Sequence, residues 1–438
     1  MRGWHRDGRL HFALGIEDTF VPQGSRRERP IDEYELTEHY ERWRDDLELV
    51  ADSGARLLRW GIPWHRVNPE PGVYDWSFPD RVLGRMTELG IEPIVDLLHY
   101  GTPLWLRSEF ANPDFPDRFA AYAVAAGERY AGSVSAYTPV NEPMIHAQFC
   151  GEYAYWPPRL SGQRGLNRMV RALALGFSRA QRGIREVLGE EVVFVHVDAG
   201  FRYAGAVDAP EHREAVERMR EQRYLVEDLV TGRVREGHPL LGDLRRSGMT
   251  DAELAELTAH PAPPDVMGVN YYPLHSTEVF EPGVHHGGGF ADPRPTRDDG
   301  TAGLREVLVA YEERYGAPVM LTETAVTGTV AQRADWMRAS VDEIGELRAE
   351  GHRVIGYTWW PLFDMYEWTW RHSRAPREDH RLTMGLYDLV EGATGLERVA
   401  NLLAAQFRAL AEGSDALAAV PLSAAQGPAA RVSGYGEE

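Results

Sequence analysis

Lysine is absent from this chain of 438 residues, and all 47 of its basic residues are arginines. Schiff-base aldolases, pyridoxal enzymes and P-loop phosphotransferases each require the amine of a lysine side chain. The absence of lysine therefore excludes these three classes of enzyme before any structural argument is made.

Cysteine and long apolar runs are also scarce. Cys150 is the single cysteine, so the chain can form no internal disulfide, and this weakly favours a reducing compartment. No apolar run is long enough to cross a bilayer. The first eight residues include none of the apolar core that a secretory signal requires. We therefore expect a cytoplasmic protein that does not contact a membrane.

Positive charge is in deficit, because 67 acidic residues oppose the 47 arginines and give a formal net charge of -20. A field of this sign repels phosphate backbones and anionic lipids. We expect no nucleic-acid or membrane partner, and a small neutral or cationic substrate instead. The sequence leaves the oligomeric state open.

Motifs that bind metals are missing as well. The chain contains no His-Glu-x-x-His sequence, and the adjacent His285 and His286 lie beside a run of glycines. We interpret these two histidines as part of a solvated loop. The protein is expected to need neither a metal nor a cofactor.

Eight strand-like apolar segments recur along the chain, with stretches of helical spacing between them. The predicted strands are residues 11–16, 55–60, 93–98, 134–140, 192–198, 266–271, 318–323 and 354–360. Several are apolar almost without interruption, as is typical of parallel strands that are covered on both faces. The pattern therefore favours a parallel sheet.

Helical periodicity is present between these strands. One apolar stripe of helical spacing consists of Leu36, Tyr40, Trp43, Leu47 and Val50. Further helices are predicted over residues 119–130, 169–188, 304–315, 331–349 and 396–410. Eight β units that alternate with helices predict a single-domain α/β fold, the (β/α)₈ barrel, with its site at the C-terminal strand ends. The alternative, an open doubly wound sheet, lacks a Gly-x-Gly-x-x-Gly sequence after its first strand.

Composition also suggests where the domain ends. We assign residues 1–412 to the barrel, and residues 413–438, rich in Ala, Gly, Ser and Pro, to a flexible tail. Two charged or Gly-rich and Pro-rich segments, 273–303 and 371–383, follow the sixth and eighth strands. They are either lids that select substrates or surface insertions, and the sequence favours neither.

Two glutamates stand at the ends of predicted strands and are separated by nearly half of the chain. Glu142 follows the fourth strand, and Glu323 ends the seventh. Glycosidic bond cleavage uses two carboxyl groups, one to donate a proton and one to attack carbon or activate water. Because the C-terminal strand ends of a barrel carry its chemistry, we interpret the two glutamates as a catalytic pair.

The sequences around both glutamates resemble those of the glycoside hydrolase family 1 β-glucosidases. Thr-Pro-Val-Asn-Glu-Pro at residues 138–143 resembles the family's acid/base motif. Leu-Thr-Glu at 321–323 resembles its nucleophile motif, followed here by Thr-Ala where the family usually has Asn-Gly. The resemblance runs from about residue 12 to about residue 387. It implies a retaining (β/α)₈-barrel glycosidase with Glu323 as nucleophile and Glu142 as acid/base.

The resemblance also implies roles for further residues. Those that match supports of the nucleophile are Arg59, Asn270 and Tyr272. Those that match sugar-binding positions are His99, Asn141, Trp360, Glu367 and Trp368. Tyr100 stands where the family usually has a tryptophan.

The first strand departs from the family, which places a sugar-binding glutamine there. We expect either Glu17 or Gln23 to take this role. Trp156 is expected to offer a flat apolar face to the sugar, as Trp360 and Trp368 do. The peptide bond between Trp360 and Pro361 is predicted to be cis, because proline lowers the cost of that geometry.

The sequence as a whole predicts an exo-acting, β-glucosidase-like hydrolase of small β-glycosides. A phosphorylated sugar is disfavoured because Glu367 would repel phosphate. One alternative is an endo-acting or differently specific hydrolase of the same clan, with an open cleft. The other is a catalytically silent sugar-binding barrel, against which the joint presence of Glu142, Glu323, Arg59 and Tyr272 argues.

Overall fold

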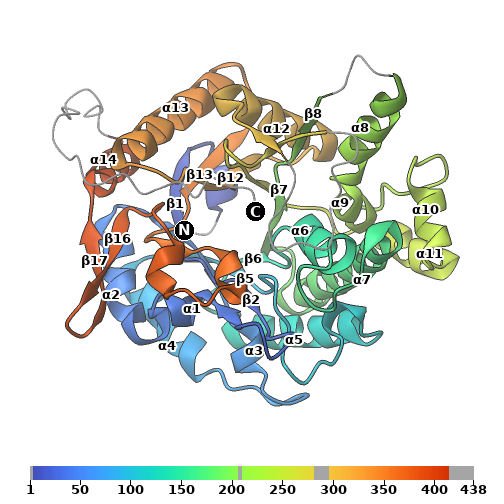
Figure 1. Cartoon of the computed structure of the whole chain (residues 1–438), viewed down its shortest axis with the longest axis horizontal. Coiled ribbons are helices and arrows are strands. Elements are labelled where there is room, and N and C mark those ends of the chain that lie inside the picture. The colour runs from blue at the N-terminus through green and yellow to red at the C-terminus, as the bar shows by residue number, and fades with distance from the viewer. Residues whose placement is uncertain (1–2, 206–209, 281–294, 414–438) are drawn as a thin grey trace.

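Eight parallel strands close into a barrel (Figure 1). In order around the barrel, these strands are β1 (His11–Gly15), β4 (Leu57–Gly61), β5 (Glu92–Asp96), β6 (Ala136–Thr138), β7 (Val193–Ala199), β9 (Val266–Asn270), β12 (Val319–Thr324) and β13 (Val354–Trp359). β1 pairs with both β4 and β13, so the barrel has no free edge. The predicted (β/α)₈ barrel is confirmed, and each predicted strand overlaps one of these eight.

The structure, a computed structural model, describes residues 3–205, 210–280 and 295–413. The predictions for His285 and His286, for residues 281–294 and for residues 414–438 lie outside the described residues. The boundary between barrel domain and tail therefore stays a prediction. Within the described ranges, no helix is long and apolar enough to cross a membrane.

Helices surround the barrel (Figure 1). The longer ones are α2 (His39–Asp52), α4 (Ser77–Leu89), α5 (Phe115–Tyr130), α7 (Gly162–Leu188), α8 (Pro210–Gln222), α12 (Gly300–Tyr315), α13 (Val330–Ala349) and α14 (Leu402–Ala411). The shorter ones are α1 (Glu33–Leu36), α3 (Trp64–Val67), α6 (Pro143–Ala147), α9 (Leu225–Val230), α10 (Leu241–Arg246) and α11 (Asp251–Ala259). Their apolar faces and the outward side chains of the strands form one large buried cluster, which is the main core.

A separate apolar cluster fills the inside of the barrel. It includes Ala13, Leu57, Ile94 and Val195 from four of the strands. Trp4, from the short 3-10 helix η1 that precedes β1, joins this cluster and covers the end at which the strands begin. The interior is therefore packed at that end, and polar groups gather at the other.

Short strands order the connections that follow the barrel strands. They are β2 (Phe20–Val21) with β3 (Ile31–Asp32), β8 (Arg202–Ala204) with β10 (Thr277–Val279) and β11 (Thr296–Arg297), and β14 (Met365–Tyr366) with β15 (Arg381–Leu382). β10 and β11 belong to the segment 273–303, and β15 belongs to 371–383. The described parts of both segments thus contain paired strands, and their role as lids stays a prediction.

The helix predicted over residues 396–410 is wrong in its first part. Residues 395–400 form strand β17 (Gly395–Ala400), which pairs in an antiparallel hairpin with β16 (Tyr387–Gly392). The turn depends on Gly395, whose φ of 110° is in a region that side chains disfavour. Helix α14 begins only after Asn401, whose side chain accepts a hydrogen bond from the amide of Leu403.

The predicted stripe of residues 36–50 is also interrupted. Leu36 ends α1, and Glu38 adopts a left-handed backbone with φ of 59° before α2 begins. Trp43, Leu47 and Val50 are buried on α2, as the stripe predicted.

Gly15 lies where β1 meets the residue after β13. A Cβ atom at this position would lie 1.9 Å from two ring atoms of Trp360. Gly15→Ala is therefore expected to lower the free energy of unfolding by about 1–3 kcal/mol, as overpacking does. Urea denaturation followed by circular dichroism measures this change.

Gly84 is the matched control, because it lies on an exposed part of α4 with nothing within 4 Å of an added Cβ. Gly84→Ala is expected to raise the free energy of unfolding by about 0.5–1 kcal/mol through helix propensity. The same sign of change in both variants would contradict the close packing of Gly15.

Candidate active site

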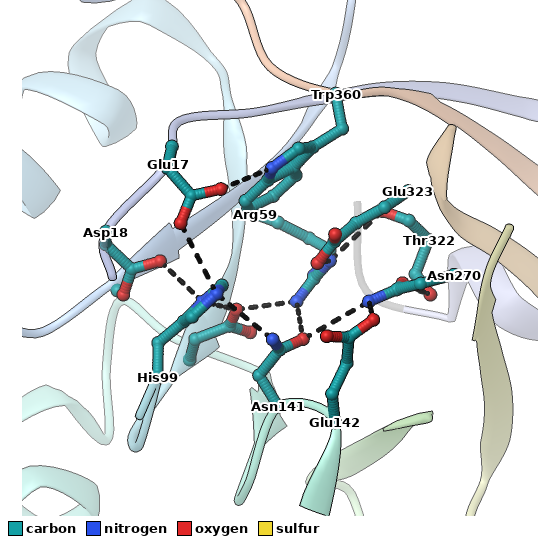
Figure 2. A network of polar contacts seen from close by, with 12 residues as sticks. Glu17, Asp18, Arg59, His99, Asn141, Glu142, Asn270, Thr322, Glu323 and Trp360 are labelled. Carbon is teal, nitrogen blue, oxygen red and sulfur yellow. Dashed lines mark hydrogen bonds and ion pairs between the residues drawn. The ribbon is translucent and has the colours of Figure 1, made fainter. Parts of the chain in front are cut away.

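Polar side chains converge at the C-terminal end of the barrel (Figure 2). They come from, or directly follow, β1, β4, β5, β6, β9, β12 and β13. The residues brought together are Glu17, Asp18, Arg59, His99, Asn141, Glu142, Asn270, Thr322, Glu323 and Trp360. Parallel strands that close into a barrel place these distant parts of the sequence in one site.

Glu323 lies in β12 and has 4% of its surface exposed. Nη1 of Arg59 donates to Oε1 of Glu323 over 2.7 Å, and the hydroxyl of Tyr272 donates to Oε2 over 2.7 Å. Both donors are residues that the sequence placed beside this glutamate. A cation and a phenol at hydrogen-bond distance favour the ionised form of the carboxyl group.

Arg59 is fully buried in β4 and joins several parts of the site. Its Nη2 donates to Oδ2 of Asp96 over 2.6 Å and to Oδ1 of Asn141 over 2.9 Å. Its Nη1 also donates to the backbone carbonyl of Thr322 over 3.1 Å. The planar guanidinium is thus fixed between the third, fourth and seventh barrel strands.

Glu142 directly precedes α6 and has a left-handed backbone, with φ of 42°. A non-glycine residue in this conformation is uncommon and marks a position worth a functional explanation. Nδ2 of Asn270 donates to Oε1 of Glu142 over 3.0 Å, and the hydroxyl of Tyr100 donates to Oε2. Glu142 therefore accepts bonds from an amide and a phenol.

Asn270, predicted as a support of Glu323, bonds Glu142 and the neighbour of Glu323. Its amide nitrogen hydrogen-bonds Glu142, and its carbonyl oxygen accepts a bond from Thr322 Oγ1 over 2.7 Å. Only β7 separates β9 from the fourth strand, β6, so the side chain at the end of β9 can bond the residue that follows β6. Sequence spacing gives the strand end but not this direction.

The two glutamates have displaced pKa values. Burial raises the pKa of both glutamates, and at Glu323 the guanidinium of Arg59 acts in the opposite direction while the charge of Glu142 adds to the rise. Interacting carboxyl groups titrate as a pair. A pair with these shifts keeps one proton near neutral pH, which is the state that acid-assisted cleavage needs.

His99 is buried among acidic groups. Its Nδ1 lies 2.7 Å from Oδ1 of Asp18 and 3.6 Å from Oδ2 of Asp96, and its Nε2 lies 3.6 Å from Oε1 of Glu17. Burial acts to lower the pKa of His99, but the charge of Asp18 and the other carboxylates hold it well above the ordinary value. Nδ2 of Asn141 lies 3.1 Å from Nε2 of His99.

Trp360 forms one wall of the site (Figure 2). Its indole nitrogen donates to Oε2 of Glu17 over 2.8 Å, and its ring stacks on His99 at 6.0 Å between centroids. The guanidinium of Arg59 lies 4.8 Å from the centroid of the same ring. The bond between Trp360 and Pro361 is cis, which confirms the prediction from the sequence.

A second group of aromatic rings lies beside Glu142. The rings of Trp156 and Trp368 approach each other at 5.0 Å, and they approach Tyr100 at 5.1 and 5.5 Å. We call Tyr100, Trp156 and Trp368 the aromatic cluster. It joins the connections that follow the third, fourth and eighth barrel strands.

Two predicted sugar-binding residues lie outside this network. The side chain of Glu367 is 38% exposed, with its Oε2 3.7 Å from Nδ1 of His380. Gln23 is exposed and donates to the backbone carbonyl of Glu28 over 2.8 Å. Of the two candidates for the strand-one role, Glu17 is therefore in the site and Gln23 is not.

Sequence reasoning did not assign roles to Asp18, Asp96, Tyr100 and Thr322. Asp18 follows the predicted strand 11–16 by two residues, and Asp96 is an acidic residue within the predicted apolar strand 93–98. This signal could have found them. Ligand atoms of Asp18, Asp96 and His99 lie within 4.8 Å of one another, as metal ligands do. The ion pairs with Arg59 and His99 already account for both carboxylates.

Comparison with known proteins identifies a family and several relatives whose sequences are similar to this chain. A model of "Glycosyl hydrolase family 1" matches residues 2–374. Beta-glucosidase A of Thermotoga maritima is 25% identical over 361 residues, covering 77% of this chain and 80% of the relative. Thermostable beta-glucosidase B of Thermobispora bispora is 28% identical over 414 residues, covering 85% of this chain and 81% of the relative.

Solved structures agree on the fold. A beta-glucosidase from Thermotoga maritima in complex with deoxynojirimycin superposes with a TM-score of 0.77 at 21% identity, covering 93% of this chain and 98% of that one. The family model spans most of the chain, and the barrel matches. The chain therefore belongs to glycosyl hydrolase family 1 and is a glycoside hydrolase.

Proposed function

We propose that the chain is a retaining, exo-acting β-glycosidase of the β-glucosidase type, with Glu323 as nucleophile and Glu142 as acid/base. The observation that carries this proposal is the unequal surroundings of the two buried glutamates. Arg59 and Tyr272 donate to Glu323, whereas Glu142 has no cation at hydrogen-bond distance among the described residues. The proton of the pair therefore belongs on Glu142, and Glu323 is the group free to attack.

The first step forms a covalent glycosyl-enzyme. A carboxylate oxygen of Glu323 bonds to the anomeric carbon while the glycosidic C–O bond breaks, and the carboxyl proton of Glu142 moves to the leaving oxygen. The anomeric configuration inverts. Arg59, held by Asp96 and Asn141, fixes the attacking carboxylate in place.

The second step releases the sugar. Glu142, now ionised, accepts a proton from water, whose oxygen bonds to the anomeric carbon as the bond to Glu323 breaks. The configuration inverts again, so the product keeps the configuration of the substrate. Asn141, beside the acid/base, is placed to bond the sugar 2-hydroxyl as positive charge develops on the ring.

Two sets of side chains support binding of one terminal sugar. His99, Glu17 and Trp360 present polar atoms and one indole face next to the glutamates. Trp368 and Trp156 present further ring surface for sugar C–H groups. Glu367 adds a partly exposed carboxylate for the far hydroxyls. The relatives named above as β-glucosidases support the same class of substrate.

The roles of the two glutamates can be read from the anomer of an azide product. Glu323→Gly is expected to lose roughly 10⁴-fold or more in activity on aryl β-glucosides. Azide should enter the vacated space and displace the aglycone once, giving an α-glycosyl azide. Glu142→Ala should still form the glycosyl-enzyme from a dinitrophenyl glycoside, and azide should then give the β-glycosyl azide. Nuclear magnetic resonance of the products distinguishes the two.

Glu128→Gln, on the exposed face of α5, is the control for loss of a carboxylate elsewhere, and it should retain normal hydrolysis. Formation of the α-glycosyl azide by the Glu142 variant would reverse the assignment. Retained hydrolysis in both glutamate variants would reject the catalytic pair.

Glu367 is expected to hold sugar hydroxyls. Glu367→Ala should lower kcat/KM for both β-glucosides and β-galactosides by about 10–100-fold, because charge-assisted hydrogen bonds are lost. The exposed Glu378, eleven residues further along the same connection, gives the control Glu378→Ala with unchanged kinetics. Unchanged kinetics in both variants across a panel of aryl glycosides would remove Glu367 from the site.

A further inference from the structure

Tyr100 occupies an unusual place beside Glu142. It follows His99 after β5, is 3% exposed and has a left-handed backbone with φ of 75°. Its ring lies against His99, His146 and the other two members of the aromatic cluster, at centroid distances of 4.7 to 5.5 Å. Family 1 β-glucosidases, which this sequence resembles, usually have a tryptophan at this position. The phenol is therefore a feature of this chain.

The phenol has defined partners. Its hydroxyl donates to Oε2 of Glu142 and accepts a bond from Nδ2 of Asn141 over 3.4 Å. Oδ1 of Asn141 in turn accepts from Arg59, which also holds Glu323. One chain of hydrogen bonds therefore runs from the guanidinium beside the nucleophile to the carboxyl group of the acid/base.

The hydroxyl keeps its proton over the working pH range. Burial, aided by the charge of Glu142, raises the pKa of Tyr100 well above its ordinary value. Burial likewise lowers the pKa of His146 to about 3, so the imidazole that touches Tyr100 is neutral. Tyr100 therefore retains a proton that it can donate to the carboxylate of Glu142.

Other groups face Glu142 from the surrounding elements. These are His99 after β5, Arg59 in β4, Asp198 in β7, Asn270 at the end of β9, Tyr272 after β9 and Glu323 in β12. Among them, Asn270 bonds the carboxyl group directly. Tyr100 and Asn270 are thus its two hydrogen-bond donors among the described side chains.

We propose that Tyr100 is a positioning residue for Glu142 and that its hydrogen bond stabilises the carboxylate form of this glutamate. The inference rests on the proposed role of Glu142 as acid/base. As Glu142 releases its proton to the leaving group, negative charge develops on the oxygen that the phenol faces. The bond becomes charge-assisted at that moment, which favours proton release in the first step and holds the carboxylate towards water in the second.

The sign of the effect on pH dependence follows from this bond. A donor that stabilises the carboxylate lowers the pKa of Glu142 relative to the same site without the donor. Glu142 must be protonated to assist a poor leaving group, so activity falls as pH rises through that pKa. Loss of the phenol therefore extends activity to higher pH.

Tyr100→Phe tests this inference with the ring retained. The alkaline limb of kcat/KM for phenyl β-glucoside, which reports the free enzyme, is expected to move upward by about one to two pH units. Tyr137→Phe is the matched control. Tyr137 is a fully buried tyrosine in β6, and its hydroxyl has no hydrogen-bond partner among the described residues. Removal of the Tyr137 hydroxyl should leave the alkaline limb of kcat/KM unchanged.

A double-mutant cycle that combines Tyr100→Phe with Glu142→Ala provides a second test. With a dinitrophenyl glycoside and azide, Tyr100→Phe should change the rate of the Glu142→Ala variant by less than about twofold, because the phenol acts through the missing carboxyl group. Thermal unfolding of each variant checks that the barrel is intact.

An unmoved alkaline limb in folded Tyr100→Phe, with only a lower kcat, would overturn the inference and reduce Tyr100 to a packing role. An equal loss of rate with and without Glu142 would do the same. The azide anomers test the role of Glu142 independently, so failure of the proposed function is distinguishable from failure of this inference.

Discussion

The site is organised by one buried guanidinium, that of Arg59, which forms ion pairs with the carboxylates of Glu323 and Asp96. Removing charges from water costs several kcal/mol per ion unless good geometry and further hydrogen bonds compensate. Here Nη1 reaches Glu323 over 2.7 Å and Nη2 reaches Asp96 over 2.6 Å. Asn141 and the Thr322 carbonyl accept the remaining bonds of the same two nitrogens.

This pairing gives the two glutamates different surroundings although both are buried. Glu323 accepts a hydrogen bond from an arginine, and Glu142 accepts hydrogen bonds from an amide and a phenol. Environment, rather than residue type, separates nucleophile from acid in such pairs. His99 extends the pattern, since its ion pair with Asp18 places a second cation at the edge of the network. Two cationic side chains thus balance part of a strongly acidic pocket.

The barrel makes this concentration of charge possible. At the end where the strands begin, the barrel interior is filled mainly by small and branched apolar side chains and is covered by Trp4. The polar residues are therefore confined to the C-terminal ends of the strands. On β12, for example, Met320 belongs to the apolar cluster inside the barrel, whereas Glu323 lies among the polar residues at the C-terminal end of the same strand (Figure 2). Gly15 and Trp360 contribute to both stability and the site. The backbone of Gly15 packs closely against the indole ring of Trp360, and this ring forms one wall of the site.

The sequence by itself determined the class of fold and most of the site. Recurring apolar runs marked all eight strands, because parallel strands are covered on both faces, and the sequences around Glu142 and Glu323 placed both at strand ends. The hairpin at residues 387–400 was missed because Leu396 fits helical and strand patterns alike. Only the tertiary structure decided that Glu17 and not Gln23 joins the polar network (Figure 2), that Asn270 bonds Glu142, and that Tyr100 bonds Glu142. Those outcomes depend on the direction of side chains across a closed barrel, and spacing along a chain contains no information about contacts between strands that lie far apart in it.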